Sequence, residues 1–304
     1  MHILITDSGV GGVSVVAYAE RFVRTQGFTE PVRLTFANAA PANDYGYNSM
    51  PSREAKIETF DRFLRNVTER YAPDMIYVAC NTLSVLMPDT PYATRAKIPV
   101  KGIVDTGVAL VVEQLLCGAG NLAGAVMPRT PPARLPAPHR DSIAIIFGTQ
   151  TTIDSGVYPR RLQERGIDGS RIVTQACPGL ADVISEDREG TKARPEIEKW
   201  VAAAIAKMPN RDAPIVACLA CTHYGYRKDL FAEALGGATV INPNESAVHD
   251  IFDHSGAMHD AEVEFITRYA LPETTVETLT WLLRDISPRT VEAMQHYVHV
   301  PDLF

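Results

Sequence analysis

Two stretches of the chain repeat one pattern of elements, and this repeat limits the folds that the chain can adopt. Residues 2–22 and residues 143–162 each read as a short apolar strand, a loop of small polar residues and a helix. Ser8 in the first stretch precedes Cys80 by 72 residues, and Thr149 in the second precedes Cys221 by the same 72. Because two pairs of elements recur at one spacing, we predict two related α/β halves.

The apolar runs indicate a mostly parallel sheet in each half. Runs rich in Val, Ile and Ala, such as residues 75–80 and 215–220, alternate with segments of helical period. Parallel strands that are covered on both faces read as continuous apolar runs, and this alternation is typical of βαβ units. We therefore predict an α/β fold of two pseudo-symmetric domains, each a mostly parallel sheet with helices on both faces. Ligands bind at the carboxyl ends of such strands, which predicts a cleft between the domains with one cysteine on each wall.

The order of these elements sets the expected domain boundaries. We expect a first domain of residues 1–103 plus 245–304, which includes a set of C-terminal helices, and a second domain of residues 104–244. Residues 118–141 contain five prolines, and each proline removes a backbone donor and fixes φ. This segment is therefore expected to be a surface linker, and a flap over the cleft is the alternative.

The C-terminal region reads as helical beyond about residue 245. Ser287 followed by Pro288 forms a good N-cap and first-turn pair for a last helix. Thr274 and Glu277 fit a capping box for the helix before it. We expect these helices to serve for packing or as an oligomer surface, on which a homodimer could form.

Composition argues against several classes of partner. The chain has 304 residues, a net charge of −7 and a pI near 5.6, and it lacks the block of Lys or Arg that nucleic-acid-binding proteins carry. No apolar run approaches the ~20 residues that span a bilayer, and the first residues do not read as a targeting leader. We therefore expect a cytoplasmic protein that binds neither nucleic acid nor membrane.

The five cysteines do not suggest a disulfide framework in a chain of this length. Cys218 and Cys221 have a C-x-x-C spacing, but three residues along a strand reverse the side-chain face, so the two thiols should point apart. No second C-x-x-C completes a zinc site. We expect Cys218, Cys117 and Cys177 to be packed thiols, whereas Cys221 stands at a strand end beside polar residues.

Residues 7–12, Asp-Ser-Gly-Val-Gly-Gly, follow the first predicted strand. They fail the dinucleotide fingerprint because Ser14 stands where the third glycine belongs, and the ending of a P-loop is missing. A glycine-rich turn at a helix N-terminus has free N–H groups that suit an anion such as a carboxylate. A plain strand–helix turn is the alternative, and it leaves Asp7 and Ser8 without a role.

A cluster of histidines and aspartates near residue 250 raises the question of a metal site. Its histidines are five residues apart, so they do not share one helix face, and solvated polar residues explain them better. We expect no metal ion and no cofactor. The cluster consists of His249, Asp250, Asp253, His254, His259 and Asp260.

Three motifs together resemble those of the glutamate racemases in the aspartate/glutamate racemase superfamily. They are residues 7–12 (DSGVGG), 80–82 (CNT) and 221–224 (CTHY), and the resemblance runs from residue 1 to about residue 250. It implies a cofactor-independent racemase with its active site in the cleft between two domains. The implied substrate is a small acidic amino acid, glutamate first, with D-glutamate supplied to peptidoglycan.

The resemblance also implies a role for each matched residue. Cys80 and Cys221 would act from opposite faces of the substrate's α-carbon, where one thiolate removes the α-proton and the other thiol returns one. Asp7 and His223 would assist the thiols. A thiol suits both roles because its ordinary pKa of about 8.5 lets it serve as base or acid. The residues implied to hold the substrate are Ser8, Tyr45, Gly46, Asn81, Thr82, Thr149, Thr152 and Thr222.

Departures from the family pattern leave the side-chain specificity open. Asp44 stands where the family has proline, residues 37–43 (ANAAPAN) replace an acidic stretch, and Gly225 replaces the proline after Tyr224. An aspartate racemase, a hydantoin racemase and a maleate isomerase-like enzyme therefore stay as alternatives. A protein that binds an acidic metabolite without turning it over is a further alternative, against which the two cysteines argue because binding needs neither.

Overall fold

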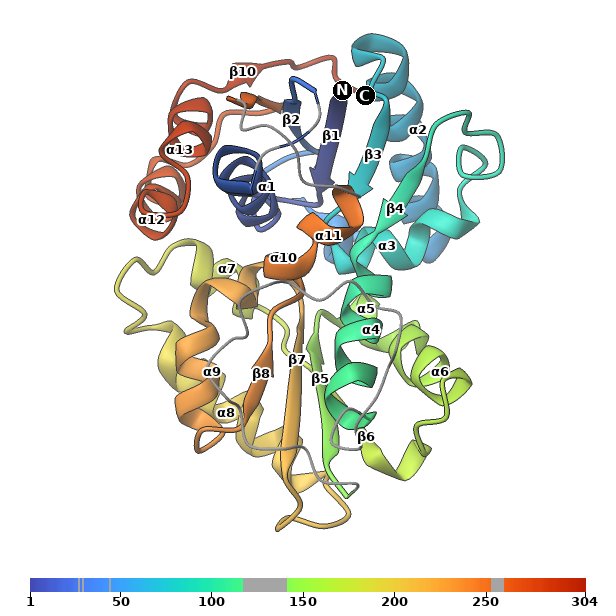
Figure 1. Ribbon diagram of the computed structural model, residues 1–304, viewed down its shortest axis with the longest axis vertical. Helices are drawn as coiled ribbons and strands as arrows, with labels where there is room; N and C mark the ends of the chain where they lie inside the picture. Colours follow the sequence, from blue (N-terminus) through green and yellow to red (C-terminus); the bar gives the residue numbers. More distant parts are fainter. Residues whose placement is uncertain (27, 29, 44, 117–140, 253–259) are drawn as a thin grey trace.

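The computed structural model describes residues 1–304 except residues 27, 29, 44, 117–140 and 253–259. Two sheets lie one above the other along the long axis of the molecule, with helices on both sides of each (Figure 1). The first sheet has six strands in the order β10-β9-β2-β1-β3-β4, and the second has four in the order β6-β5-β7-β8. Every recorded pairing between these strands is parallel. The predicted α/β fold with two mostly parallel sheets is confirmed.

The two sheets share one strand order, because β2-β1-β3-β4 in the first corresponds to β6-β5-β7-β8 in the second. This correspondence is the structural form of the repeat seen in the sequence. The strands of the first sheet are β1 (His2–Asp7), β2 (Arg33–Asn38), β3 (Met75–Val78), β4 (Val100–Gly102), β9 (Glu262–Thr267) and β10 (Val298–His299). Those of the second sheet are β5 (Ile143–Gly148), β6 (Ile172–Ala176), β7 (Ile215–Ala220) and β8 (Thr239–Ile241).

The helices follow the strands in the expected alternation. The first half contributes α1 (Val13–Gln26), α2 (Arg53–Tyr71), α3 (Asn81–Leu86) and α4 (Ile103–Leu116). The second half contributes α5 (Gln150–Asp154), α6 (Val157–Glu164), α7 (Leu180–Ser185), α8 (Ala193–Ala206) and α9 (Lys228–Ala234). The chain then returns through α10 (Pro243–Ser246), α11 (Val248–Ile251), α12 (Glu273–Leu283) and α13 (Pro288–Gln295). The short 3₁₀ turns are η1 (Tyr47–Ser49), η2 (Met87–Asp89), η3 (Gly169–Arg171) and η4 (Thr222–Arg227).

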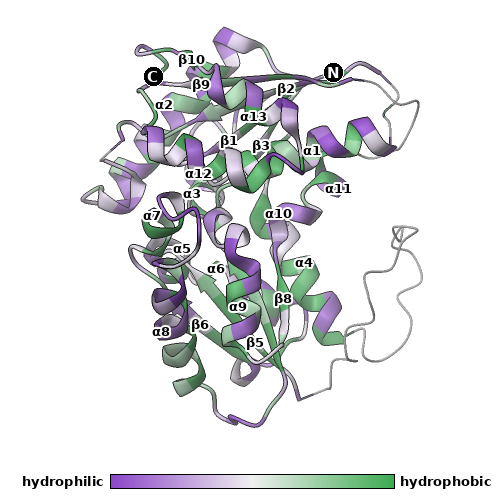
Figure 2. Cartoon of the chain, turned by 90° about the vertical axis from the view of Figure 1, so that its left-hand side faces the viewer, coloured by the Kyte–Doolittle hydropathy of each residue, from purple (hydrophilic) through white to green (hydrophobic). Residues whose placement is uncertain are grey.

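A continuous apolar core joins the two sheets on one side of the molecule. It contains Val78 from the first sheet, Val108 from α4 and Ile146 from the second sheet, all fully buried. The outer faces are covered separately, by α1 and the C-terminal helices on the first sheet and by α8 and α9 on the second. In Figure 2 the strands of the second sheet are mainly hydrophobic, whereas α8 and α9 also carry hydrophilic stretches. The shared core holds the sheets together and leaves the carboxyl ends of their strands facing one another.

We propose domain boundaries at residues 103/104 and 244/245, where α4 and α10 carry the chain from one sheet to the other. The strands on either side of these points belong to different sheets, which supports this division. The predicted linker 118–141 lies outside the described residues except for Asp141, and Cys117 lies outside them too. None of the helices within the described ranges has the length and apolar content needed to cross a membrane.

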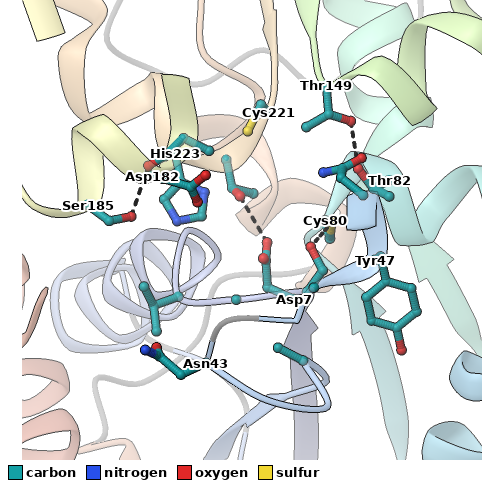
Figure 3. A pocket seen from close by; sticks show the side chains of 18 of the residues that line it. Asp7, Asn43, Tyr47, Cys80, Thr82, Thr149, Asp182, Ser185, Cys221 and His223 are labelled. Carbon is teal, nitrogen blue, oxygen red and sulfur yellow. Dashed lines mark hydrogen bonds between the residues drawn. The ribbon is translucent and has the colours of Figure 1, made fainter. Parts of the chain in front are cut away.

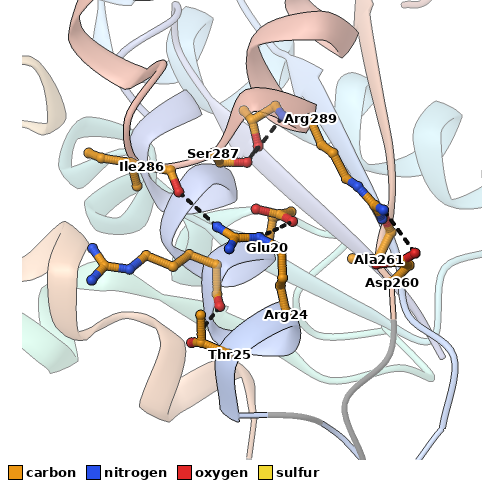
Figure 4. A network of polar contacts seen from close by, with 10 residues as sticks. Glu20, Arg24, Thr25, Asp260, Ala261, Ile286, Ser287 and Arg289 are labelled. Carbon is orange, nitrogen blue, oxygen red and sulfur yellow. Dashed lines mark hydrogen bonds and ion pairs between the residues drawn. The ribbon is translucent and has the colours of Figure 1, made fainter.

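Polar contacts hold the C-terminal helices against α1 and against the residues that precede β9 (Figure 4). The guanidinium of Arg24 donates to the buried carboxylate of Glu20 at 3.1 Å and to the carbonyl of Ile286 at 3.2 Å. In the first turn of α13, Arg289 forms an ion pair of 2.8 Å with Asp260, which lies just before β9. The C-terminal segment is therefore packed on the first sheet and its helix α1.

One of the two predicted helix starts in this segment is confirmed and the other is wrong. Ser287 caps α13, since its hydroxyl accepts a hydrogen bond of 3.1 Å from the N–H of Thr290. The helix before it begins at Glu273 with Pro272 at the N-cap, two residues before the N-cap that the capping box at Thr274 requires. Proline has no side-chain oxygen that could accept a hydrogen bond, so this helix begins without a side-chain cap.

Candidate active site

A cavity of about 450 Å³ lies where the carboxyl ends of the two sheets meet. Its inner wall is built from the ends of four corresponding strands, with Asp7 at the end of β1, Cys80 after β3, Thr149 after β5 and Cys221 after β7 (Figure 3). Open parallel sheets bind their ligands at this edge, and the volume suits a small molecule. The cavity is therefore the candidate active site.

The two cysteines approach the cavity from different domains. Cys80 lies at the N-cap of α3 and Cys221 at the N-cap of η4, and they are 5% and 6% exposed. Cys218 lies on the other face of β7, where it packs with the apolar core of α4 and α6. Cys221 belongs to the opposite core cluster. The prediction that the two thiols of the C-x-x-C spacing point apart is confirmed.

Burial sets the pKa of both thiols. It raises the pKa of Cys80 to about 12, and the neighbouring Asp7 adds to this effect. The pKa of Cys221 lies well above its usual value, again mainly through burial. Hydrogen bonds oppose this rise, since the Ser8 hydroxyl lies 3.0 Å from the Cys80 sulfur and the backbone N–H of His223 favours the Cys221 thiolate. With pKa values raised in this way, both thiols favour the protonated form at neutral pH, so each needs a base beside it to become a thiolate.

Asp7 is the carboxylate at the centre of the site. Its side chain is buried, and burial raises its pKa to about 7. The hydroxyl of Thr222 donates a hydrogen bond of 2.9 Å to its Oδ2 atom, and because Thr222 opens η4 after β7 of the second sheet, this bond joins the two domains. A carboxyl with a pKa near neutrality can both take up and release a proton at physiological pH.

His223 follows Thr222 on the wall of the second domain and faces the same cavity. Its removal from bulk water lowers its pKa to about 4. The imidazole is therefore neutral at pH 7, and it can donate or accept a hydrogen bond in the cavity without carrying a positive charge.

The residues implied to hold the substrate divide into those on the cavity surface and those off it. Thr152 lies behind the wall, 1% exposed, with its hydroxyl 3.1 Å from that of Thr149 and 3.4 Å from that of Thr82. Tyr45 also lies off the surface, with a side chain that is 44% exposed. The cavity surface includes Ser8, Gly46, Asn81, Thr82, Thr149 and Thr222.

Asn81 presents an amide group to the cavity. Its carbonyl oxygen accepts a hydrogen bond of 2.7 Å from the hydroxyl of Tyr158, which fixes the orientation of the amide. Its Nδ2 atom is buried and has no hydrogen-bond partner among the residues that the structure describes. A buried donor without a partner costs free energy, so this N–H₂ group is suited to a ligand acceptor.

The structure adds two segments to the site that sequence reasoning missed. One is α7 with the residue after it, which contributes Asp182, Ser185 and Glu186 (Figure 3). The other follows β9 and contributes the Tyr269–Thr275 stretch, in a region expected to serve only packing or an oligomer surface. The apolar run before Tyr269 could have indicated a strand in this region. The sequence does not show, however, that this strand, β9, pairs with β2 beside the site.

The charges of the cavity wall are all acidic. Asp7, Asp182 and Glu186 line it, and within the described ranges no Lys or Arg does. An anion bound here is therefore held by hydroxyl, amide and backbone N–H groups. No group of three or more His, Cys, Asp or Glu side chains among the described residues is arranged to hold a metal ion. In the histidine cluster weighed above, residues 253–259 lie outside the described part of the chain.

Gly11 allows the two domains to approach each other at this site. A Cβ atom there would lie 2.5 Å from Nδ1 and 2.8 Å from Cε1 of His223. We expect Gly11→Ala to lower the free energy of unfolding by about 1–3 kcal/mol, as overpacking does. Chemical unfolding measures this, with Gly9→Ala as the control, because a Cβ at Gly9 lies at an ordinary 3.7 Å from His223. Equal stability of the two variants would contradict the close packing.

Comparison with known proteins gives one result for sequences and one for structures. No protein-family model matches the chain. The glutamate racemase of Roseobacter denitrificans is 36% identical over 239 residues, which cover 78% of each chain. That of Jannaschia sp. is 28% identical over 253 residues, which cover 82% of this chain and 83% of the other.

Solved structures share the fold over nearly the whole chain. The glutamate racemase of Francisella tularensis in complex with D-glutamate superposes with a TM-score of 0.70 at 19% identity, covering 99% of this chain and 98% of the other. That of Campylobacter jejuni superposes with a TM-score of 0.66 at 21% identity, covering 93% and 98%. The relative from Roseobacter denitrificans, at 36% identity over 78% of each chain, shows that the chain belongs to the glutamate racemase family.

Proposed function

We propose that this racemase interconverts L- and D-glutamate without a cofactor, using Cys80 and Cys221 as a pair of proton-transfer groups. The observation that carries the proposal is that the two thiols stand at corresponding strand ends of two related sheets and line one cavity. Inversion at a carbon needs a base on one face and an acid on the other, and a pair of walls supplies both. The structural relatives from Francisella tularensis and Escherichia coli hold D-glutamate and L-glutamate, which supports the same substrate here.

The proton transfers balance within the site. Asp7, with a pKa of about 7, accepts the thiol proton of Cys80 and leaves a thiolate. That thiolate takes the α-proton of one enantiomer, and the Cys221 thiol gives its proton to the opposite face of the carbanion. In the reverse direction, the Cys221 thiolate left by this transfer takes the α-proton and the Cys80 thiol returns one, while the backbone N–H of His223 stabilises the Cys221 thiolate. Because both thiols are buried, bulk water has little access to the carbanion, and the proton is delivered by the thiol.

The substrate is held by neutral donors. The amide N–H₂ of Asn81 and the hydroxyls of Thr82 and Thr149 supply donors for carboxylates, whereas the Thr222 hydroxyl donates to Asp7. The acidic side chains offer acceptors for the substrate ammonium group. Fixed donors of this kind stabilise the charge that develops on the α-carboxylate when the α-proton leaves. We further propose that the enzyme works in the cytoplasm, as a homodimer, and supplies D-glutamate for peptidoglycan.

The proposed function predicts optical inversion by the purified full-length protein. L-Glutamate and D-glutamate should each lose circular dichroism until the signal reaches zero, without added pyridoxal phosphate, nucleotide or metal and with a chelator present. L-Aspartate serves as the control, and its turnover should be slower. Failure to racemise either enantiomer of glutamate, or inversion of aspartate at the higher rate, would contradict the proposal.

A further inference from the structure

Tyr269 enters the cavity from the segment that follows β9, in the C-terminal part of the chain. β9 pairs with β2 in the first sheet, so its carboxyl end lies beside the ends of β2 and β1. The next residues, Leu271, Pro272 and Thr275, continue the wall toward the start of α12. This segment therefore forms the side of the cavity next to Asp7.

The Tyr269 hydroxyl has a defined orientation. Its oxygen accepts a hydrogen bond of 3.1 Å from Nδ2 of Asn38, the last residue of β2. The amide of Asn38 is itself fixed, because its Oδ1 atom accepts a hydrogen bond of 3.0 Å from the N–H of Ala40. With its oxygen engaged as an acceptor, the phenol keeps its own proton to donate, and no acceptor for that proton is recorded among the described residues.

The loop that carries Tyr269 is held in place independently of that hydroxyl. The N–H of Tyr269 lies 3.4 Å from Oγ1 of Thr267, and the Thr267 hydroxyl donates to the carbonyl of Tyr269 at 3.1 Å. The N–H of Leu271 donates to the hydroxyl of Tyr297 at 3.2 Å. A side chain on a fixed loop meets its ligand at a lower entropic cost than one on a free loop.

The ligand chemistry follows from the character of the cavity. Its described lining offers neutral donors and no Lys or Arg, so each carboxylate of an acidic ligand depends on individual hydroxyl and amide groups. The Asn81 amide and the hydroxyls of Thr82 and Thr149 supply such donors at the strand ends of β3 and β5. Beside β1 and β2, the Tyr269 hydroxyl is a donor of the same kind.

We propose that Tyr269 contacts the substrate and donates its phenolic hydrogen bond to a carboxylate of glutamate. This inference rests on the proposed function, and it adds a substrate-binding residue from the C-terminal segment. A tyrosine in this role selects for an acidic ligand, because its O–H donor gains most from a charged acceptor.

The test is Tyr269→Phe, which removes the hydroxyl and keeps the ring. Glutamate affinity is measured by calorimetry and KM by the racemisation assay, with the thermal midpoint recorded for each variant. We expect Kd and KM to rise about tenfold or more, as for a lost bond to a charged group, with kcat changed less than about threefold. Tyr297→Phe is the matched control, since it removes a hydroxyl that bonds the same loop without lining the cavity. Its Kd and KM should stay close to those of the unsubstituted protein.

The outcomes separate this inference from the function on which it rests. If the unsubstituted protein racemises glutamate and Tyr269→Phe leaves KM unchanged, or both tyrosine variants shift KM alike, the inference is wrong and the function stands. If glutamate binds in a manner that depends on Tyr269 but is not racemised, the inference stands and the catalytic proposal is wrong. If the unsubstituted protein neither binds nor racemises glutamate, both are overturned.

Discussion

Replacing Cys80 or Cys221 with alanine is expected to abolish racemisation in both directions, with a loss in kcat of about a thousandfold or more. Each variant keeps one thiol on one wall of the cavity, and that thiol meets the α-proton of one enantiomer only. Inversion needs both walls, so neither direction survives the loss of either thiol. The circular dichroism assay on L- and D-glutamate measures the effect.

The same variants should reveal which enantiomer each thiol serves. In D₂O the remaining thiol can remove and return a hydrogen on its own side, which exchanges the α-hydrogen with retention of configuration. We expect Cys80→Ala and Cys221→Ala to prefer opposite enantiomers in this slow exchange, followed by ¹H NMR. An equal exchange of both enantiomers by one variant would contradict the two-wall mechanism.

Cys218→Ala is the control for both experiments. Cys218 is fully buried on the far face of β7, so its loss should cost stability, about 0.5–3 kcal/mol as for most core changes, and leave kcat largely intact. If Cys218→Ala inactivated the protein while Cys80→Ala did not, the C-x-x-C pair would be the reactive one. The assignment of Cys80 would then be wrong.

Asp7→Asn is expected to lower kcat by about a hundredfold while making the protein more stable above neutral pH. The amide keeps an oxygen that accepts the Thr222 hydrogen bond, but it can no longer take a proton from a thiol. Without that base, the Cys80 thiol with its pKa of about 12 yields little thiolate at pH 7. The loss of activity therefore comes from proton transfer and not from unfolding.

The pH dependence of stability follows from the raised pKa of this carboxyl. Burial raises it from its ordinary 3.8 to about 7, so the folded state favours the protonated form. The stability that the protonated Asp7 carboxyl contributes to the folded state is fully present below pH 3.8. It is lost as the pH rises through about 7. Asparagine does not ionise in this window. The free energy of unfolding of Asp7→Asn at pH 8 should therefore exceed that of the unsubstituted protein by an amount on the order of a few kcal/mol.

Denaturant unfolding at pH 5 and pH 8 measures this difference. The unsubstituted protein should lose more stability between these pH values than Asp7→Asn. Asp61→Asn is the control for activity, because Asp61 is nearly buried but hydrogen-bonds the N–H of Tyr92 away from the cavity. Full activity in Asp7→Asn, or a pH dependence equal to that of the unsubstituted protein, would remove Asp7 from the proposed mechanism.

Local signals in the sequence determined the repeated architecture and the inner wall of the cavity. Strand runs, helix starts and the residues at strand ends are properties of neighbouring positions, and the 72-residue spacing showed that they occur twice. The same reasoning placed Cys80 and Cys221 at strand ends and turned Cys218 to the other face, because side chains alternate along a strand. Ser287 and Pro288 marked their helix start for a similarly local reason.

Tertiary structure alone decided which of the polar residues near these motifs reach the cavity. Thr152 matches a binding position in sequence, yet its hydroxyl turns to Thr149 and Thr82 behind the wall. Tyr45 matches one too, and its side chain faces solvent. One residue along a short helix or loop changes the direction of a side chain, and only the packed chain determines that direction.

The outer wall of the site, which is formed by α7 with Glu186 and by residues 269–275, also depended on the tertiary structure. Tyr269 stands 262 residues after Asp7, and what brings them to one cavity is the pairing of β9 with β2 in the first sheet. Likewise Asp182 and Glu186 reach the cavity because α7 lies across from α12. Pairing between strands distant in sequence leaves no periodic mark on either strand. The sequence by itself therefore determined the two halves and the two thiols, whereas the choice of strand neighbours, and with it the composition of the outer wall, was decided by the fold.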